Sequence, residues 1–261
     1  MANNSKIESG INTYVGNFND IIGIFIELGD KYRPQNERLS IEAMQEQSSY
    51  IRMSINNVDD SLAEAIIAES NRKEAFEPLQ TIATSVLAMA RTFNLPAAAM
   101  LHIKELVRKI RGKRAKPIPV TSESKNGEPV KHISVSQMSF NEQIEHLTQL
   151  VDLLAHIPAY KPIEHDVTVT GLAELSARMG AANDEATQAY LLLSNARVHR
   201  NELLYAPVTG MMDTALSAKE YIKAVFGTSS AVYKQVHKIK FSNRKPWRKP
   251  NIKLKVESIT A

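Results

Sequence analysis

Ten residues of the chain, 32–41, read YRPQNERLSI, and ten further along, 160–169, read YKPIEHDVTV. Both stretches begin with a tyrosine, a cation and a proline, and both end with an apolar, a hydroxyl and a β-branched residue. The residue before a proline is disfavoured in the α-helical region, so a helix is expected to end there. A hydroxyl residue such as Ser40 is a preferred N-cap, so a new helix is expected to begin after it. The pattern recurs after 128 residues, which indicates an internal repeat.

Other matches follow in the same order in the two halves of the chain. Residues 76–79 read FEPL, and residues 205–208, which lie 129 positions later, read YAPV. Residues 107–111 match residues 236–240 at the same spacing. One inserted residue explains the change of spacing from 128 to 129. A duplicated ancestor explains these ordered matches better than coincidence does.

Apolar residues recur every three or four positions through most of the chain, which is typical of amphipathic helices. This spacing predicts helices over residues 11–31, 41 to about 70, 78–89, 96–110, 140–157, 168 to about 200, 207–226, and 228 or 229 to 240. Four helices of this kind can enclose a shared apolar seam, whereas a pair would leave its apolar stripe in water. We therefore predict an all-α fold that is a tandem duplication of an antiparallel four-helix bundle unit.

The segment between the two predicted units differs from both in composition. Residues 113–137 contain three prolines, an Asn-Gly pair and few apolar residues, which is typical of a flexible linker. The predicted organisation is therefore a first bundle over residues 1–112 and a second bundle over 138–241. An extended basic tail over 242–261 is predicted to follow.

The composition removes several classes of protein. The chain has no cysteine and only 10 glycines, with 43% hydrophobic residues. Disulfide frameworks, thiolate metal sites and catalytic cysteines are therefore excluded, and glycine-rich phosphate loops are not expected. The start of the sequence lacks the apolar run of a secretory signal, and no stretch reaches the roughly 20 apolar residues of a bilayer span. We predict a cytoplasmic protein for which a membrane is not an expected partner.

Familiar catalytic motifs are missing as well. The sequence has no HExxH, no GxSxG and no glycine motif for binding phosphate or a dinucleotide. Glu142 and His146, one helical turn apart, are interpreted as neighbours on a helix surface. Arg72 and Arg200, which match at a spacing of 128, are interpreted as structural cations at helix ends or in ion pairs. We predict a non-catalytic protein without metal or cofactor, and an active site assembled from scattered residues stays open.

The formal net charge of +4 is unevenly distributed. Residues 104–116 carry seven cations against Glu105, a net charge of +6, and residues 238–255 carry eight cations and no acid. The rest of the chain therefore sums to −10. Cations at a helix C-terminus complement the negative end of the helix dipole, but the run RKPWRKP at 244–250 lies beyond the last predicted helix. Cations around a single tryptophan suit a phosphate backbone with a stacked base.

The predicted anion-binding residues lie in these two basic segments. They are Arg108, Lys109, Arg111, Lys113, Arg114 and Lys116 in the first segment, and Lys238, Lys240, Arg244, Lys245, Trp247, Arg248, Lys249, Lys253 and Lys255 in the second. The favoured function is a helical interaction or scaffold protein whose basic ends bind an anionic partner, which is a nucleic acid, a ribonucleoprotein or an acidic protein surface. The tail could instead fold back onto the acidic body or serve only as a solubilising terminus.

Two alternative functions stay open. One is a structural component of a phage particle or other self-assembling complex, which would form homo-oligomers. The other is a membrane-active helical protein.

Overall fold

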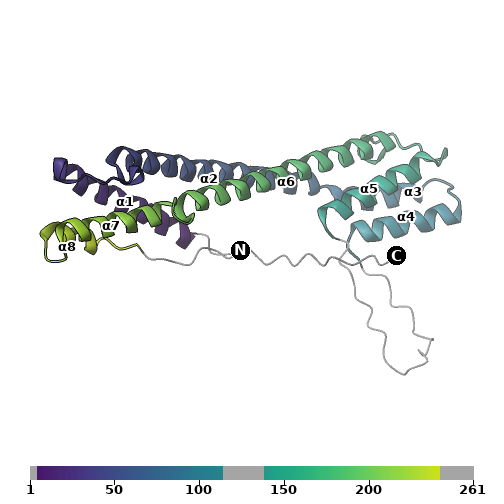
Figure 1. Ribbon diagram of the computed structural model, residues 1–261. Coiled ribbons are helices and arrows are strands. Elements are labelled where there is room, and N and C mark those ends of the chain that lie inside the picture. Colours follow the sequence, from purple (N-terminus) through teal and green to yellow (C-terminus); the bar gives the residue numbers. More distant parts are fainter. Residues whose placement is uncertain (1–4, 114–137, 242–261) are drawn as a thin grey trace, which may run out of the picture. The chain divides into compact units, whose positions relative to one another are not determined.

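The computed structural model describes residues 5–113 and 138–241, and this part of the chain contains helices and turns but no strand (Figure 1). The all-helical prediction is confirmed. The helices are α1 (Ser5–Leu28), α2 (Ile41–Phe76), α3 (Leu79–Ala90), α4 (Ala97–Ile110), α5 (Phe140–Ala155), α6 (Val169–Tyr205), α7 (Met211–Phe226) and α8 (Ala231–Lys238), with short 3-10 turns η1 (Gly29–Lys31), η2 (Glu37–Leu39) and η3 (His165–Val167). The predicted tail lies outside the described residues, as does the predicted linker apart from Lys113.

Hydroxyl side chains mark the starts of several helices. The Ser40 Oγ accepts a hydrogen bond from the backbone amide of Ala43 at 3.1 Å, before α2. The Thr168 Oγ1 accepts from the amide of Gly171 at 3.0 Å, before α6. Each side chain satisfies an amide that has no partner within its own helix. Ser139 and Ser230 cap α5 and α8 in the same way.

The chain folds into two compact units, and neither unit is a continuous half of the sequence. Unit 1 combines the residues up to Asp60 with the residues from Ser194 onward, and unit 2 runs from Ser61 to Leu193. The boundaries between the units fall inside α2 and α6. The compact units therefore do not coincide with the sequential bundles predicted over residues 1–112 and 138–241.

The lengths of α2 and α6 give the physical reason for this difference. They have 36 and 37 residues, so each is roughly 55 Å long at 1.5 Å per residue. The next two helices in the first half, α3 and α4, have only 12 and 14 residues. Buried residues nonetheless recur every seventh position along both long helices, at Met44, Ile51, Val58 and Ala65 in α2 and at Leu172, Met179, Ala186 and Leu193 in α6. Helices from both halves are needed to cover apolar stripes of that length.

Unit 1 takes its core from the first and last helices of the chain. The side chains that form it include Phe18 and Phe25 of α1, Met44 and Ile51 of α2, Leu204 of α6, Ile222 of α7 and Val236 of α8. The Phe25 ring stacks on that of Tyr32, with 4.2 Å between the ring centroids. The first part of α2 and the last part of α6 thus belong to one core.

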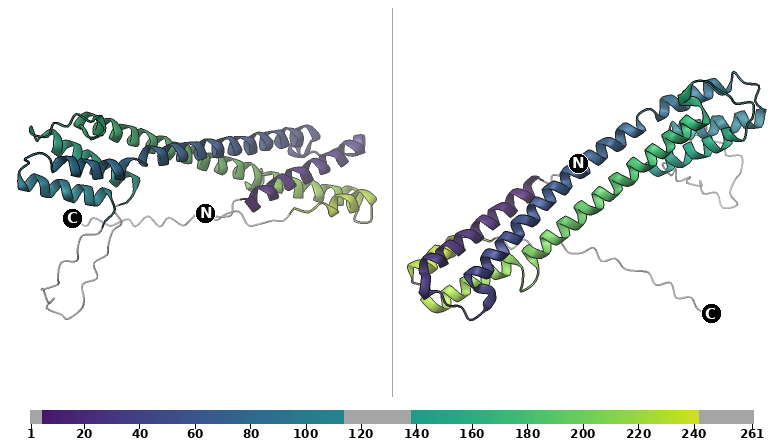
Figure 2. Two further views of the ribbon diagram at one scale, coloured as in Figure 1. Left: turned by 180° about the vertical axis from the view of Figure 1, so that it is seen from behind. Right: turned by 90° about the horizontal axis from the view of Figure 1, so that it is seen from above.

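Unit 2 takes its core from the middle of the chain. Its buried side chains include Phe76 of α2, Leu79 of α3, Ile103 of α4, Leu150 of α5 and Leu172 of α6. Figures 1 and 2 show α4 beside both α3 and α5. The α4 to α5 contact joins helices from the two halves of the chain.

The two stretches that recur in the sequence form the same contacts in the two units. The Tyr32 hydroxyl donates a hydrogen bond to the carbonyl oxygen of Leu39 at 2.7 Å, and the Tyr160 hydroxyl donates to the carbonyl oxygen of Val167 at 2.7 Å. Each ring also meets an aromatic ring from the other half of the chain edge to face, at 5.3 Å for Tyr32 with Tyr221 and 5.5 Å for Tyr160 with Phe93. A second matched pair joins α1 to α2 through Ser48 and Asn19 (2.6 Å), and α5 to α6 through Thr148 and Ser176 (2.9 Å).

Candidate anion-binding ends

The first candidate site is the C-terminal end of α4 in unit 2. Four cationic residues, Arg108, Lys109, Arg111 and Lys113, lie within six positions there. The Arg108 guanidinium donates to the carbonyl oxygen of Lys113 at 2.9 Å, and the Lys113 amide donates to the carbonyl oxygen of Arg108 at 3.0 Å. Gly112 provides the left-handed backbone (φ 65°) that lets the chain turn back at this point. Arg108 therefore closes the helix end, and none of the other three side chains forms such a hydrogen bond within the described residues.

The α4 end keeps its positive charge. None of these four side chains pairs with a carboxylate within residues 5–113 and 138–241. Lys113 is exposed, and Arg108, Lys109 and Arg111 are half-buried. The negative end of the helix dipole offsets part of the charge. Among the described residues, the end is therefore a cluster of four cations without a neutralising carboxylate.

The second candidate site is the end of α8 in unit 1, where Lys238 and Lys240 are both exposed. The Asn17 amide of α1 donates to the carbonyl oxygen of Lys240 at 2.8 Å, which holds the backbone here against α1. Lys219 of α7 adds a third amine, because it donates to the carbonyl oxygen of Ile239. Burial, together with the positive charge of Lys240, lowers the pKa of Lys219.

Lys219 is the residue of this site that sequence reasoning missed. It lies in α7, 19 residues before Lys238, in a part of the sequence with no run of cations. Its ammonium lies 5.1 Å from the centroid of the Phe241 ring, a cation–π distance. Only the packing of α7 against α8 brings it to the basic end, so no spacing rule could have found it.

The predicted binding residues that the structure describes are divided between the two units. The α4 end belongs to unit 2, and the α8 end belongs to unit 1. The other predicted residues lie outside the described part of the chain: Arg114, Lys116, Arg244, Lys245, Trp247, Arg248, Lys249, Lys253 and Lys255.

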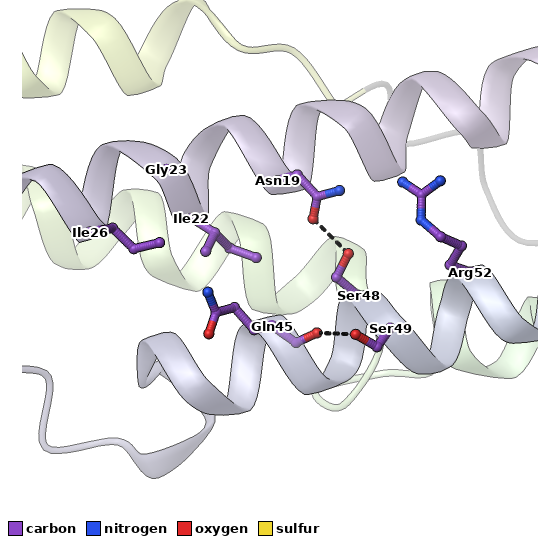
Figure 3. Close-up of a pocket in the computed structure, with 8 residues that line it drawn as sticks. All are labelled: Asn19, Ile22, Gly23, Ile26, Gln45, Ser48, Ser49 and Arg52. Carbon is purple, nitrogen blue, oxygen red and sulfur yellow. Dashed lines mark hydrogen bonds between the residues drawn. The ribbon is translucent and has the colours of Figure 1, made fainter.

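A shallow groove of about 500 Å³ lies between α1 and α2 in unit 1, and sequence reasoning did not predict it (Figure 3). The residues that line it are Asn19, Ile22, Gly23, Ile26, Gln45, Ser48, Ser49 and Arg52. Arg52 is the only charged residue of this lining, and it forms no ion pair within the part of the chain that the structure describes. The groove therefore offers one cation and several amide and hydroxyl groups, and no acid–base pair.

Arg72 is structural, as the sequence indicated. Its guanidinium forms an ion pair with Glu69, donates to the side-chain Oδ1 of Asn183 at 3.3 Å, and lies 4.1 Å from the centroid of the Phe140 ring. Asn183 in turn donates to Asn141 at 2.7 Å. These residues connect α2, α5 and α6 inside unit 2, so Arg72 is not available to a ligand.

The interpretation of Glu142 and His146 as surface neighbours is wrong. His146 is only 6% exposed, and neither ring nitrogen has a hydrogen-bond partner in the described structure. Glu142 instead completes a capping box with Ser139 at the start of α5. The face of α5 that contacts the core of unit 2 is broader than the apolar stripe in the sequence, and His146 lies inside it.

Two further features bear on function. Over residues 5–113 and 138–241, no cluster of His, Asp and Glu side chains has the geometry to hold a metal ion. No helix described there has both the length and the apolar character that crossing a bilayer requires. Comparison of the chain with protein-family models, curated proteins and solved structures finds no match.

Proposed function

We propose that the protein is a non-catalytic helical scaffold whose basic ends bind an anionic partner, a nucleic acid or a ribonucleoprotein. The observation that carries this proposal is the α4 end, where four cations within six residues have no carboxylate partner in the described structure. A cationic cluster of this kind is suited to phosphate groups, which provide most of the binding energy in nonspecific nucleic-acid complexes.

The α8 end supports the same proposal. Lys219, Lys238 and Lys240 gather positive charge there, and the sequence continues directly into the basic tail of residues 242–261. In this proposal the tail extends the α8 end, its cations bind phosphates, and Trp247 stacks on a base.

We also propose that the chain is a tandem duplication of a four-helix unit in which the two copies have exchanged partners. The matched tyrosine contacts and the matched α1–α2 and α5–α6 contacts support this proposal. Under this view α1 to α4 correspond to α5 to α8. Each compact unit then combines the first part of one copy with the last part of the other. The two basic ends occupy equivalent places in the two copies.

The test is binding of fluorescent single-stranded RNA and DNA, measured by anisotropy from about 50 to 200 mM salt. One variant reverses Lys109, Arg111 and Lys113 to Glu and spares Arg108, because Arg108 closes α4. Its matched control reverses three exposed cations elsewhere, Arg91, Lys161 and Arg178. A second variant reverses Arg244, Lys245, Arg248 and Lys249 of the tail.

The expected result is salt-sensitive binding that weakens in both end variants and not in the control. Each lost phosphate contact lowers the slope of log affinity against log salt by about 0.7 for a single strand. The proposal fails if the unchanged protein shows no salt-sensitive binding near physiological ionic strength. It also fails if the control weakens binding as much as the end variants do.

A self-assembling structural component is the second candidate function. The observation that favours it is that each compact unit is built from both halves of the chain, so that one chain can complete the units of another.

A further inference from the structure

The two halves of the chain are covalently joined at a single place. Residues 5–113 and residues 138–241 connect only through the 24 residues of segment 114–137. Each compact unit nonetheless takes helices from both halves. All other connections between the halves are therefore noncovalent.

Specific contacts in both units join the two halves. In unit 1 the Gln47 amide of α2 donates to the carbonyl oxygen of Thr209 at 2.8 Å, and Asn17 of α1 donates to the carbonyl oxygen of Lys240 at 2.8 Å. In unit 2 the Phe76 and Phe140 rings meet edge to face, with 4.8 Å between their centroids. The geometry of these contacts does not depend on whether the two halves belong to the same chain.

We propose that two copies of this chain form a closed dimer by exchanging halves. Residues 5–113 of one chain pack with residues 138–241 of the second, and the reciprocal pair forms as well. Every core contact and hydrogen bond among the described residues is kept in each pair, because the exchange changes only which chain supplies each half. Such an exchange is a low-cost route to a closed, symmetric assembly.

The balance between the closed monomer and the exchanged dimer depends on segment 114–137. The described residues on either side of this segment meet in unit 2, because a Cβ placed on Gly112 would lie 2.5 Å from the Sδ of Met138. The composition of the segment predicts a flexible linker, and a flexible linker of 24 residues has a root-mean-square span of roughly 27 Å, which corresponds to an effective concentration in the millimolar range. The closed monomer therefore dominates at micromolar concentration, and the exchanged dimer increases as the protein concentration approaches that range.

Exchange between folded chains is expected to be slow. The halves separate only when the cores around Phe18 in unit 1 and Leu150 in unit 2 both open, and both side chains are fully buried. Refolding together at high concentration is therefore the route that populates the dimer, and mixing of folded monomers is not. If the proposed function is correct, the dimer would also carry two α4 ends and two α8 ends, which increases avidity for a polyanion.

The absence of cysteine allows a direct test with the full-length chain. One variant carries Gln47→Cys and a second carries Thr209→Cys. The two variants are unfolded, mixed and refolded together. Refolding is carried out at about 10 µM and at concentrations that approach the millimolar effective concentration. The refolded samples are then treated with a short bis-maleimide. Adducts of twice the chain mass are then quantified on a denaturing gel. The double variant Gln47→Cys, Thr209→Cys is the positive control, since its two cysteines are neighbours within one folded chain.

The matched negative control pairs the Gln47→Cys chain with a Gln80→Cys chain, because Gln80 is exposed on α3 of unit 2. The expected result is an intermolecular adduct between positions 47 and 209, and the fraction of chains in this adduct should increase roughly tenfold for a tenfold rise in refolding concentration while dimer is the minor species. No such rise is expected for positions 47 and 80. The proposal is overturned by two results together. The double variant crosslinks within one chain, and the mixed Gln47→Cys and Thr209→Cys chains give no more adduct of twice the chain mass than the 47–80 control at any concentration. This outcome is independent of nucleic-acid binding.

Discussion

The hydroxyl of Tyr160 donates a hydrogen bond to the carbonyl oxygen of Val167, 2.7 Å away, and closes the turn that leads into α6. Tyr32 closes the turn into α2 with the same bond to Leu39, also at 2.7 Å. Both phenols are buried. One tyrosine in each half thus fixes how a long helix begins, and two separate stretches of sequence reach the same local structure.

Replacing either tyrosine with phenylalanine should cost a similar amount of stability. Tyr32→Phe and Tyr160→Phe each remove one buried hydrogen bond and leave a carbonyl group without that partner, which costs about 1 kcal/mol or somewhat more. Urea unfolding followed by circular dichroism measures the loss, and hydrogen exchange assigns it to the turn before α2 or α6.

The control for the tyrosine pair is Tyr50→Phe, because Tyr50 is 53% exposed and its hydroxyl donates to the exposed Glu46 carboxylate. This change should alter the free energy of unfolding by less than about 0.5 kcal/mol. A loss at Tyr50 equal to that at Tyr32 would show that the turn hydrogen bonds have no special role.

Alkaline pH should destabilise the fold through the same two phenols. Burial raises the pKa of Tyr160 to about 12. Burial, together with the neighbouring Tyr221, raises the pKa of Tyr32 as well. In the unfolded chain a tyrosine loses its proton near pH 10, so the folded state holds these protons more tightly. Their contribution to stability is fully present below about pH 10 and is lost as pH rises toward about 12.

Urea midpoints measured between about pH 8 and pH 11.5 test this expectation. The unchanged chain should lose stability steeply above about pH 10, and Tyr160→Phe should make that decline shallower. An unchanged slope in the variant would mean that Tyr160 is not protected from ionisation in the folded state.

The buried Arg72 should be needed for the stability of unit 2. Its side chain is 14% exposed, and it joins Glu69, Asn183 and the ring of Phe140. Arg72→Ala leaves Glu69 and Asn183 without this partner and should cost about 3 kcal/mol. Arg72→Met keeps much of the packing and should cost less.

The matched control for Arg72 is its neighbour Lys73, which forms an ion pair with Glu69 at 3.5 Å but is 68% exposed. Lys73→Ala should change the free energy of unfolding by less than about 0.5 kcal/mol. If Arg72→Ala were as mild as Lys73→Ala, the network would be solvated rather than buried.

Replacing the buried His146 with leucine should stabilise the protein. Both ring nitrogens are desolvated and lack a hydrogen-bond partner in the described structure, so the imidazole contributes a penalty that leucine avoids. The expected gain for His146→Leu is about 1 kcal/mol, measured by urea unfolding. His156→Leu is the control, since His156 is exposed and its Nδ1 contacts the carbonyl oxygen of Asp152 at 2.7 Å. A loss of stability in His146→Leu would indicate that the imidazole has a bound partner.

Much of the local structure could be predicted from the sequence. The three- and four-residue spacing of apolar side chains placed all the described helices, and prolines and hydroxyl residues marked their ends near Pro34, Ser40, Pro78 and Pro96. The cluster of cations at the end of α4 is also visible in the sequence, because its members lie close together there. These features depend on neighbouring residues alone, which is why a spacing rule finds them.

The partners of the helices could not be predicted in the same way. Consecutive helices usually pack together, so bundles confined to one half were the natural expectation. The seven-residue recurrence from Met44 to Ala65 already extends beyond what α3 and α4 can cover, but it does not indicate which helices cover the rest. Lys219 was missed for the same reason, because only tertiary packing brings α7 to the α8 end.

Each compact unit is built from both halves of the chain, so cleavage between the halves should leave the protein assembled. A site for a specific protease, inserted between residues 114 and 137, allows the folded full-length protein to be cut there. The masses of the products are then measured by sedimentation under native conditions, with circular dichroism of the same sample. The structure predicts that both fragments sediment together at the mass of the uncut chain with unchanged helicity. Two fragments that separate while each stays folded would contradict it.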